Sequence, residues 1–226
     1  MLTRRVGEVL VRKRLVVIAT VLLAGFSWAS SLRAETLDFR LLPNQSRATF
    51  KSDAPLETFV GNTTADGIDG TLTVDPAKPE AAVATIKVDM NLVRTGIERR
   101  DAQMRSKEFL NTEMELNRWV TFEVKAVEIA GPLEPGKTIP AEVRGILTVK
   151  QKPVERVAEA TVTYIKLTPE ELESQRRFGF TSDNVKVRAK LTTTFTDHGM
   201  QVPRILFFKV SDELQLETDL TFVRVP

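Results

Sequence analysis

The sequence contains no cysteine and only one histidine, His198, among its 226 residues. The absence of cysteine excludes disulfides, thiol chemistry, cysteine metal sites and a lipid-modified amino-terminal cysteine. A zinc site without cysteine usually needs several histidines, and a Ser/His triad needs a histidine near a nucleophilic serine, so a single histidine favours neither site. The catalytic motifs G-x-S-x-G and H-E-x-x-H are also missing. We therefore predict neither catalysis nor a metal site, and we expect His198 to be a turn or surface residue.

The first 34 residues are typical of a secretory signal peptide. Five basic residues between Arg4 and Arg14 precede the apolar run LVVIATVLLAGF, residues 15–26, and the small-residue stretch SWASSLRA. The apolar run is shorter than the about 18 residues that a membrane-spanning helix needs. We expect cleavage after Ala34, with Ala29 as the alternative site and an uncleaved signal anchor as the alternative interpretation. The sequence thus predicts an exported protein.

The positive charge of the chain belongs to this leader. The whole chain has 32 basic and 30 acidic residues, of which residues 1–34 hold six basic and one acidic, so residues 35–226 carry 26 basic and 29 acidic side chains. Cleavage therefore changes the formal net charge from +2 to −3. Because a nucleic-acid-binding surface needs excess positive charge, we predict no nucleic-acid partner.

Apolar residues recur at every second position along most of residues 35–226. This period of two marks strands with one buried and one solvated face, and glycine and proline separate the strands as in an antiparallel meander. We predict an all-β fold in one domain, residues 35–226, whose last strand closes the sheet against the first. Within residues 119–130 we place Val120, Phe122, Val124 and Ala126 on one face of the strand. The clearest stretches are DGIDGTLTVD (66–75), AAVATIKVDMNL (81–92), WVTFEVKAVEIA (119–130) and DELQLETDLTFVRV (212–225).

Two stretches depart from the strand pattern. GIERRDAQMRSKEFLN, residues 96–111, predicts a charged helix that lies as a lid on the rest of the molecule, with Ile97 and Met104 on one face. Phe109 and Leu110 are then expected to turn inward. TPEELESQ, residues 168–175, begins with a capping threonine and a first-turn proline, which predicts a short helix or structured loop at the rim.

The segment TGIERRDAQMRSKEFLNTEMELNRWVTF, residues 95–122, resembles the central motif of the YceI-like, lipocalin-like polyisoprenoid-binding proteins. That motif reads roughly R-D-x-H-L/M-R-S-x-[DE]-F-L/F-N/D, then T-F after a short connection. NQSRATF (44–50), FVGNTTADGIDGTLTVDP (59–76) and VRGILTVKQKPVERV (143–157) resemble its flanking motifs in the same order, so the resemblance covers about residues 36–165. Gln45 and Gln103 stand where the family has histidines.

The resemblance implies an eight-stranded antiparallel barrel of lipocalin-like form with one short helix near its mouth. It also implies a periplasmic carrier of a long isoprenoid lipid, of quinone or prenyl phosphate type, that does no chemistry on its ligand and needs no other cofactor. The interior of an eight-stranded barrel suits either packed side chains or one slim ligand, so a ligand-free structural or interaction barrel is the alternative. Transient contact with a membrane is compatible with this interpretation. The sequence does not determine the oligomeric state, and a homodimer is one alternative.

The residues expected to bind the lipid face the bore of this barrel or lie on the helix and the turn that follows it. Arg100 is expected either to orient a polar or phosphate head group or to stay solvated, Arg99 to stay solvated and Asp101 to pair locally. Phe207 and Phe208 cannot both face inward on one regular strand, so one is expected to support a loop or a partner contact. The candidate binding residues are Phe50, Phe59, Ile86, Val88, Met90, Arg100, Met104, Phe109, Leu110, Phe122 and Val124.

Overall fold

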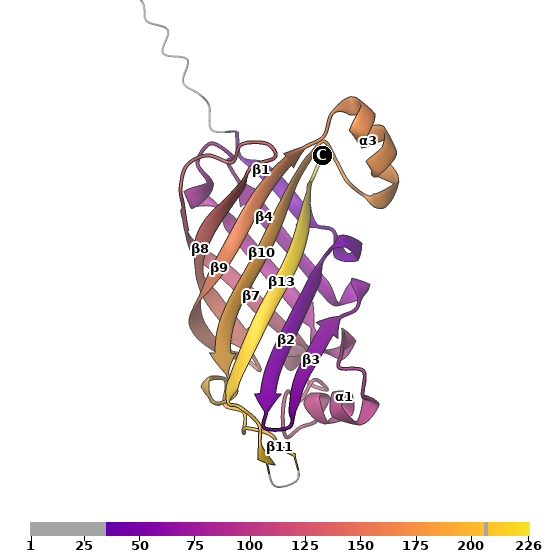
Figure 1. Ribbon diagram of the computed structural model, residues 1–226, viewed down its shortest axis with the longest axis vertical. Coiled ribbons are helices and arrows are strands. Elements are labelled where there is room, and N and C mark those ends of the chain that lie inside the picture. The colour runs from indigo at the N-terminus through magenta and orange to yellow at the C-terminus, as the bar shows by residue number, and fades with distance from the viewer. Residues whose placement is uncertain (1–34, 206–207) are drawn as a thin grey trace, which may run out of the picture. The chain divides into compact units, whose positions relative to one another are not determined.

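The computed structural model describes residues 35–205 and 208–226. The predicted signal peptide, residues 1–34, and Phe207 lie outside the described residues, and so does the side chain of Phe208. The described residues form one antiparallel barrel (Figure 1).

The barrel is a closed ring of eight antiparallel strands. In ring order they are β1 (Leu37–Leu41), β4 (Ile68–Val74), β5 (Val83–Asp89), β7 (Trp119–Ile129), β8 (Thr138–Val149), β9 (Lys152–Lys166), β10 (Asp183–Thr194) and β13 (Glu213–Arg224). β13 closes the ring by pairing with β1, where Phe39 lies opposite Arg224. The predicted eight-stranded antiparallel barrel is therefore confirmed, as is the pairing of the last strand with the first. Closure leaves no free sheet edge along this ring.

Three strands of the ring continue past a single 3-10 turn. β2 (Arg47–Ala54) continues β1, β4 continues β3 (Glu57–Thr63), and β6 (Val93–Arg94) continues β5. The pairing register is the same on both sides of the turns, because Phe39 lies opposite Leu72 and Phe50 opposite Gly61. Each of these strand pairs therefore acts as one long, bent strand.

Helices lie at both ends of the barrel. α1 (Glu98–Arg105) and the small hairpin of β11 (Arg204–Ile205) and β12 (Phe208–Lys209) lie at one end, which we call the α1 end (Figure 1). α3 (Pro169–Gln175) and the C-terminus lie at the other, the α3 end (Figure 1). α3 starts as predicted, with Thr168 and Glu171 forming a capping box. No helix within residues 35–205 and 208–226 is long and apolar enough to cross a membrane.

The predicted helix over residues 96–111 is shorter in the structure. α1 ends at Arg105 because Ser106 leaves the helical region at ψ 166°, and Asn111 adopts a positive φ of 55°. The chain turns back here, and the Leu110 N–H donates to the Met104 carbonyl at 3.1 Å. This turn brings Leu110 inward, as predicted, where it is 5% exposed. A one-turn helix, α2 (Glu115–Arg118), then leads into β7.

One inward position on β7 was predicted wrongly. A β-bulge after Val124 makes Lys125 an extra residue, since Val124 lies opposite Gly145 and Ala126 opposite Arg144. Ala126 is consequently exposed, and Val127 takes the inward position instead. Alternation resumes beyond the bulge with the faces exchanged.

Candidate functional site

The barrel encloses a cavity of about 510 Å³. Its lining comes from every strand of the barrel wall except β1 and is mostly aliphatic and aromatic. The volume falls in the range of about 300–1,000 Å³ found for small-molecule sites. The structure thus has an open bore rather than the fully packed interior that was the alternative.

All the predicted binding residues line this cavity. They are Phe50, Phe59, Ile86, Val88, Met90, Arg100, Met104, Phe109, Leu110, Phe122 and Val124. Period-two alternation identified those on strands, and the turn after α1 brings Phe109 and Leu110 to the same space. Their contact with a lipid stays a prediction.

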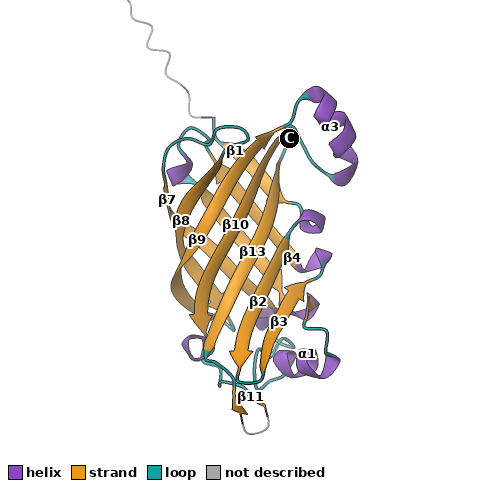
Figure 2. Cartoon of the chain, in the orientation of Figure 1, coloured by secondary structure: helices purple, strands orange, loops and turns teal. Residues whose placement is uncertain are grey.

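The cavity is elongated along the strands. Five alternate residues of β13, from Leu214 to Phe222, all line it. At ~3.4 Å per residue, this row spans about 27 Å along the strand. The strands run the length of the barrel in Figure 2, so the bore suits a long, slim molecule better than a compact one.

Two phenylalanine rings leave the bore open because they lie against glycines in the wall. A Cβ placed on Gly61 would lie 2.1 Å from Cε1 of Phe50, and one on Gly145 would lie 2.6 Å from Cζ of Phe122. A side chain at Gly61 would therefore push the Phe50 ring off the wall, toward the open bore. Sequence alternation alone gave no sign of this arrangement.

The cavity opens at the α1 end. Five of its lining residues there are also exposed to solvent: Glu57, Ile97, Arg99, Gln103 and Arg204. They come from the start of β3, from α1 and the residue before it, and from β11. We call these five residues the mouth. Gln103, one of the two glutamines at family histidine positions, therefore stands where a ligand would enter.

Arg100 sits beside the mouth with its charge already paired. Its guanidinium carbon lies 4.3 Å from the ring centroid of Phe59, and its Nη2 donates to Glu57 Oε1 at 2.6 Å. The side chain is 24% exposed. Arg99 is exposed, as expected. Arg100 therefore joins α1 to the β2–β3 hairpin, and a head group that used its charge would compete with Glu57.

Asp101 fixes the start of α1 to the barrel wall. Its side chain is 3% exposed, and Oδ1 accepts hydrogen bonds from the N–H and the hydroxyl of Thr95 at 2.9 and 2.6 Å. These are the local contacts expected for Asp101. α1 is thus held at its first turn, next to β6.

The wall beside α1 has a gap in its hydrogen bonding, which the sequence did not reveal. Among the described strands, β6 pairs only with β3, so residues 95–118 separate it from β7. Arg118 bridges this region, since its Nε and Nη2 donate to Oδ2 of Asp89 at 2.9 and 2.6 Å. Asp89 is 1% exposed. This ion pair lies beside the last register pair of β5 and β7, Asp89 and Trp119, and so strengthens the end of that ladder next to the gap.

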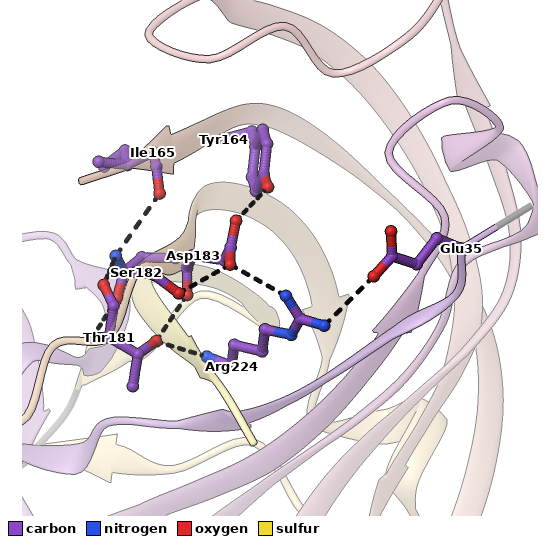
Figure 3. A network of polar contacts seen from close by, with 8 residues as sticks. Glu35, Tyr164, Ile165, Thr181, Ser182, Asp183 and Arg224 are labelled. Atoms are coloured by element: carbon purple, nitrogen blue, oxygen red, sulfur yellow. Dashed lines mark hydrogen bonds and ion pairs between the residues drawn. The ribbon is translucent and has the colours of Figure 1, made fainter. Parts of the chain in front are cut away.

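At the α3 end, a polar network (Figure 3) lies next to packed apolar residues of the core. The Tyr164 hydroxyl donates to one oxygen of Asp183, and Ser182 and Arg224 donate to the other at 2.9 and 3.2 Å. Burial raises the pKa of Tyr164, and the hydrogen bond to Asp183 adds to this effect. Burial by itself would raise the pKa of Asp183, but the three hydrogen bonds and the Arg224 charge together lower it. Both groups therefore keep their neutral-pH charge states, and the network stays intact.

His198 lies in a turn, which is one of the two expected positions, but it is buried rather than on the surface. It ends the 3-10 turn Thr196–His198 and is 0% exposed. Nε2 lies 2.8 Å from the Thr193 hydroxyl and Nδ1 lies 3.1 Å from the Lys152 carbonyl, so both ring nitrogens have partners. Burial lowers the pKa of His198. Its role is to fasten the β8–β9 hairpin to β10, and no cluster of three potential metal-ligating side chains occurs within the described residues.

Ser52 is a polar residue of the lining that the sequence prediction missed. It is 3% exposed, and its hydroxyl has no hydrogen-bond partner among the described residues. A buried unpaired hydroxyl costs about 1–3 kcal/mol relative to a paired one. Ser52 is therefore one of the few polar residues in a mostly apolar wall, with Thr193 and Thr218 among the others.

A closed eight-stranded barrel with an elongated apolar bore defines the lipocalin-like class of folds. The chain belongs to the YceI-like domain family, whose model matches residues 39–222. A sequence search of curated proteins gives no match.

Several solved structures share this fold. A Saccharophagus degradans domain described as polyisoprenoid-binding and implicated in plant cell wall breakdown has 16% identity and a TM-score of 0.60, over 84% of this chain and 99% of that one. Burkholderia cenocepacia BcnA has 16% identity and a TM-score of 0.58, over 80% and 98%. The Campylobacter jejuni YceI protein has 15% identity and a TM-score of 0.56, over 74% and 84%. At such identities these likenesses show the shared fold alone.

Proposed function

We propose that this protein is a periplasmic carrier that binds a long isoprenoid lipid, of quinone or prenyl phosphate type, without changing it chemically. The observation that carries the proposal is the elongated apolar bore with an opening at one end. Membership of the YceI-like family supports it, as does the similar Saccharophagus degradans domain that is described as polyisoprenoid-binding. The leader-like residues 1–34 support the periplasmic location.

The expected affinity suits carriage rather than permanent capture. Burying ten methylenes at about 0.8 kcal/mol each gives roughly 8 kcal/mol before ordering costs. Some of this is lost to immobilising the chain, but a longer isoprenoid buries more. We therefore expect dissociation constants around micromolar or tighter.

The lining supports binding without catalysis. General acid–base chemistry needs a positioned proton donor and acceptor within reach of the ligand. Glu57, the carboxylate at the mouth, is instead paired with Arg100, and the inner lining is apolar. The carrier therefore stores or transfers its ligand.

The test is to purify residues 35–226, extract the protein with organic solvent and measure co-purifying lipids by mass spectrometry. A near-stoichiometric isoprenoid is the expected result. The matched variants are Gly61→Ala, which drives Phe50 into the bore, and Val60→Ala, which changes the outward face of the same strand. Loading should fall for the first and not for the second. No lipid in the wild type, even after incubation with quinone and prenyl phosphate, would instead favour the ligand-free structural barrel.

A further inference from the structure

Exposed apolar side chains lie at the mouth and on α2. Leu56 is 79% exposed, Leu116 is 70%, Met114 is 49% and Ile97 is 48%. Leu56 is in the turn between β2 and β3, Ile97 caps α1, and the other two lie at α2. Leu56 and Leu116 are the two most exposed large apolar residues within the described chain.

Leu56 and Ile97 lie close in sequence to the two residues of the Glu57–Arg100 ion pair. Leu56 directly precedes Glu57, and Ile97 lies three residues before Arg100, the partner of Glu57 at 2.6 Å. Ile97 also lines the cavity. The two apolar side chains therefore stand on the rim of the opening through which a ligand would pass.

Exposed basic residues lie on α1 and on the β11–β12 hairpin at the mouth, although residues 35–226 are acidic as a whole and Met114 and Leu116 lie beside Glu113 and Glu115. Residues 94–107 contain five basic and two acidic residues. One of the acids, Asp101, is buried and hydrogen-bonded to Thr95. Arg99 and Arg204 at the mouth are exposed and take part in none of the ion pairs between described residues. Lys209, the register partner of Arg204, is also exposed.

We propose that the mouth end docks on a bilayer surface that contains anionic phospholipid, with Leu56 and Ile97 in the headgroup layer. Isolated apolar side chains set among cations are the pattern of interfacial membrane binding, where apolar burial and attraction to anionic lipid add together. The core of a protein–protein interface is instead depleted of charge. Docking in this orientation opens the bore against the bilayer, so an isoprenoid chain passes between them without crossing water.

This docking goes beyond the proposed function, because it is measured without any bore ligand. The mature chain, residues 35–226, is sedimented with vesicles of phosphatidylcholine, with or without phosphatidylglycerol. We expect binding to the anionic vesicles that weakens with added salt. Leu56→Asp with Ile97→Asp should lower the partition coefficient at least about tenfold. Arg99→Gln and Arg204→Gln should each lower it about fivefold.

The matched control is Phe178→Asp at the α3 end. Phe178 is 47% exposed and lies beside Arg177, whose guanidinium carbon is 4.6 Å from the ring centroid. This variant should bind vesicles like the wild type, and thermal unfolding should show that all variants are folded. The proposal is overturned if the wild type ignores anionic vesicles, or if Phe178→Asp abolishes binding while the Leu56 and Ile97 changes do not. Lipid extraction separates the two proposals, since a loaded barrel that does not dock overturns only the docking.

Discussion

Each end of this barrel carries an arginine–carboxylate pair, and the two carboxylates differ in burial. At the closed α3 end, Arg224 meets Asp183, whose side chain is 6% exposed. At the mouth, Arg100 meets Glu57, whose side chain is 49% exposed. Asp183 has two further donors in Tyr164 and Ser182. The same chemistry therefore seals one end and leaves the other in contact with water.

The comparison teaches where a ligand can enter. An exposed ion pair contributes about 0–1 kcal/mol to stability, so it can open at little cost. A buried carboxylate with several donors cannot be uncovered cheaply, because its loss leaves buried partners unpaired. The barrel is accordingly rigid where the chain must stay closed and weakly held where the bore opens.

The strongest test of this contrast removes the carboxylate at each end. Asp183→Ala should destabilise the protein by about 2–4 kcal/mol, because Tyr164 and Arg224 lose their partner in a largely buried site. Glu57→Ala should cost less than about 1 kcal/mol. Urea unfolding measures both. Equal losses for the two variants would mean that the ends do not differ in the way their burial indicates.

A second test fills the bore without touching either end. Gly61→Ala should cost about 1–3 kcal/mol through overpacking against Phe50. It should also lower the amount of bound isoprenoid about tenfold, since the displaced ring occupies the lipid's path. Lipid extraction and urea unfolding measure the two effects separately. Unchanged loading in the destabilised variant would show that the ligand does not pass Phe50.

Acid should affect the α1 end before the α3 end. The pKa of His198 is lowered by burial and by nearby Arg156, against the opposing Lys152 carbonyl and Asp197. The unfolded chain therefore takes up a proton first, and the free energy of unfolding falls as pH drops below about 6.5, by at most about 1.4 kcal/mol per pH unit. The pKa of Asp183 is also lowered, so its contribution is complete above its unfolded value and is lost only below about pH 4.

Stability measured against pH for the wild type and His198→Asn checks this order. The wild type should lose stability between pH 6.5 and 5 more steeply than the variant. Parallel curves for the two proteins would contradict the assignment of this loss to His198.

The smallest effect is expected at Ser52. Ser52→Ala removes a buried unpaired hydroxyl, so the protein should be as stable as the wild type or up to about 1 kcal/mol more stable. A ligand oxygen that hydrogen-bonds to Ser52 would make the same change weaken binding. Urea unfolding and a binding titration with a quinone separate these two effects. A loss of stability would show that the hydroxyl has a partner in the folded protein.

Local sequence patterns predicted much of the fold because they reflect contacts between near neighbours. Alternation on β13 gave its inward row from Leu214 to Phe222, and the Thr168 cap gave the start of α3. The bulge after Val124 escaped prediction because a one-residue register shift depends on the partner strand. The long-range contacts of His198 also escaped it, since Lys152 is 46 residues away in the chain.

The sequence predicted the residues that line the bore more readily than the position of its mouth. Inward strand positions define a bore whether or not it is filled, but the mouth depends on how the β2–β3 turn, α1 and β11 meet in space. The bond between Asp89 and Arg118 likewise joins residues 29 apart in the sequence. No periodicity could have signalled that contact.

The most direct test of the central claim is photo-crosslinking with an isoprenoid that carries a diazirine on its chain, followed by mass-spectrometric mapping of the adducts. The account predicts light-dependent adducts on inward residues such as Val88, Phe122 and Leu216, and their loss when unlabelled isoprenoid is added in excess. Adducts confined to outward residues such as Val157, or adducts that excess isoprenoid does not remove, would contradict it.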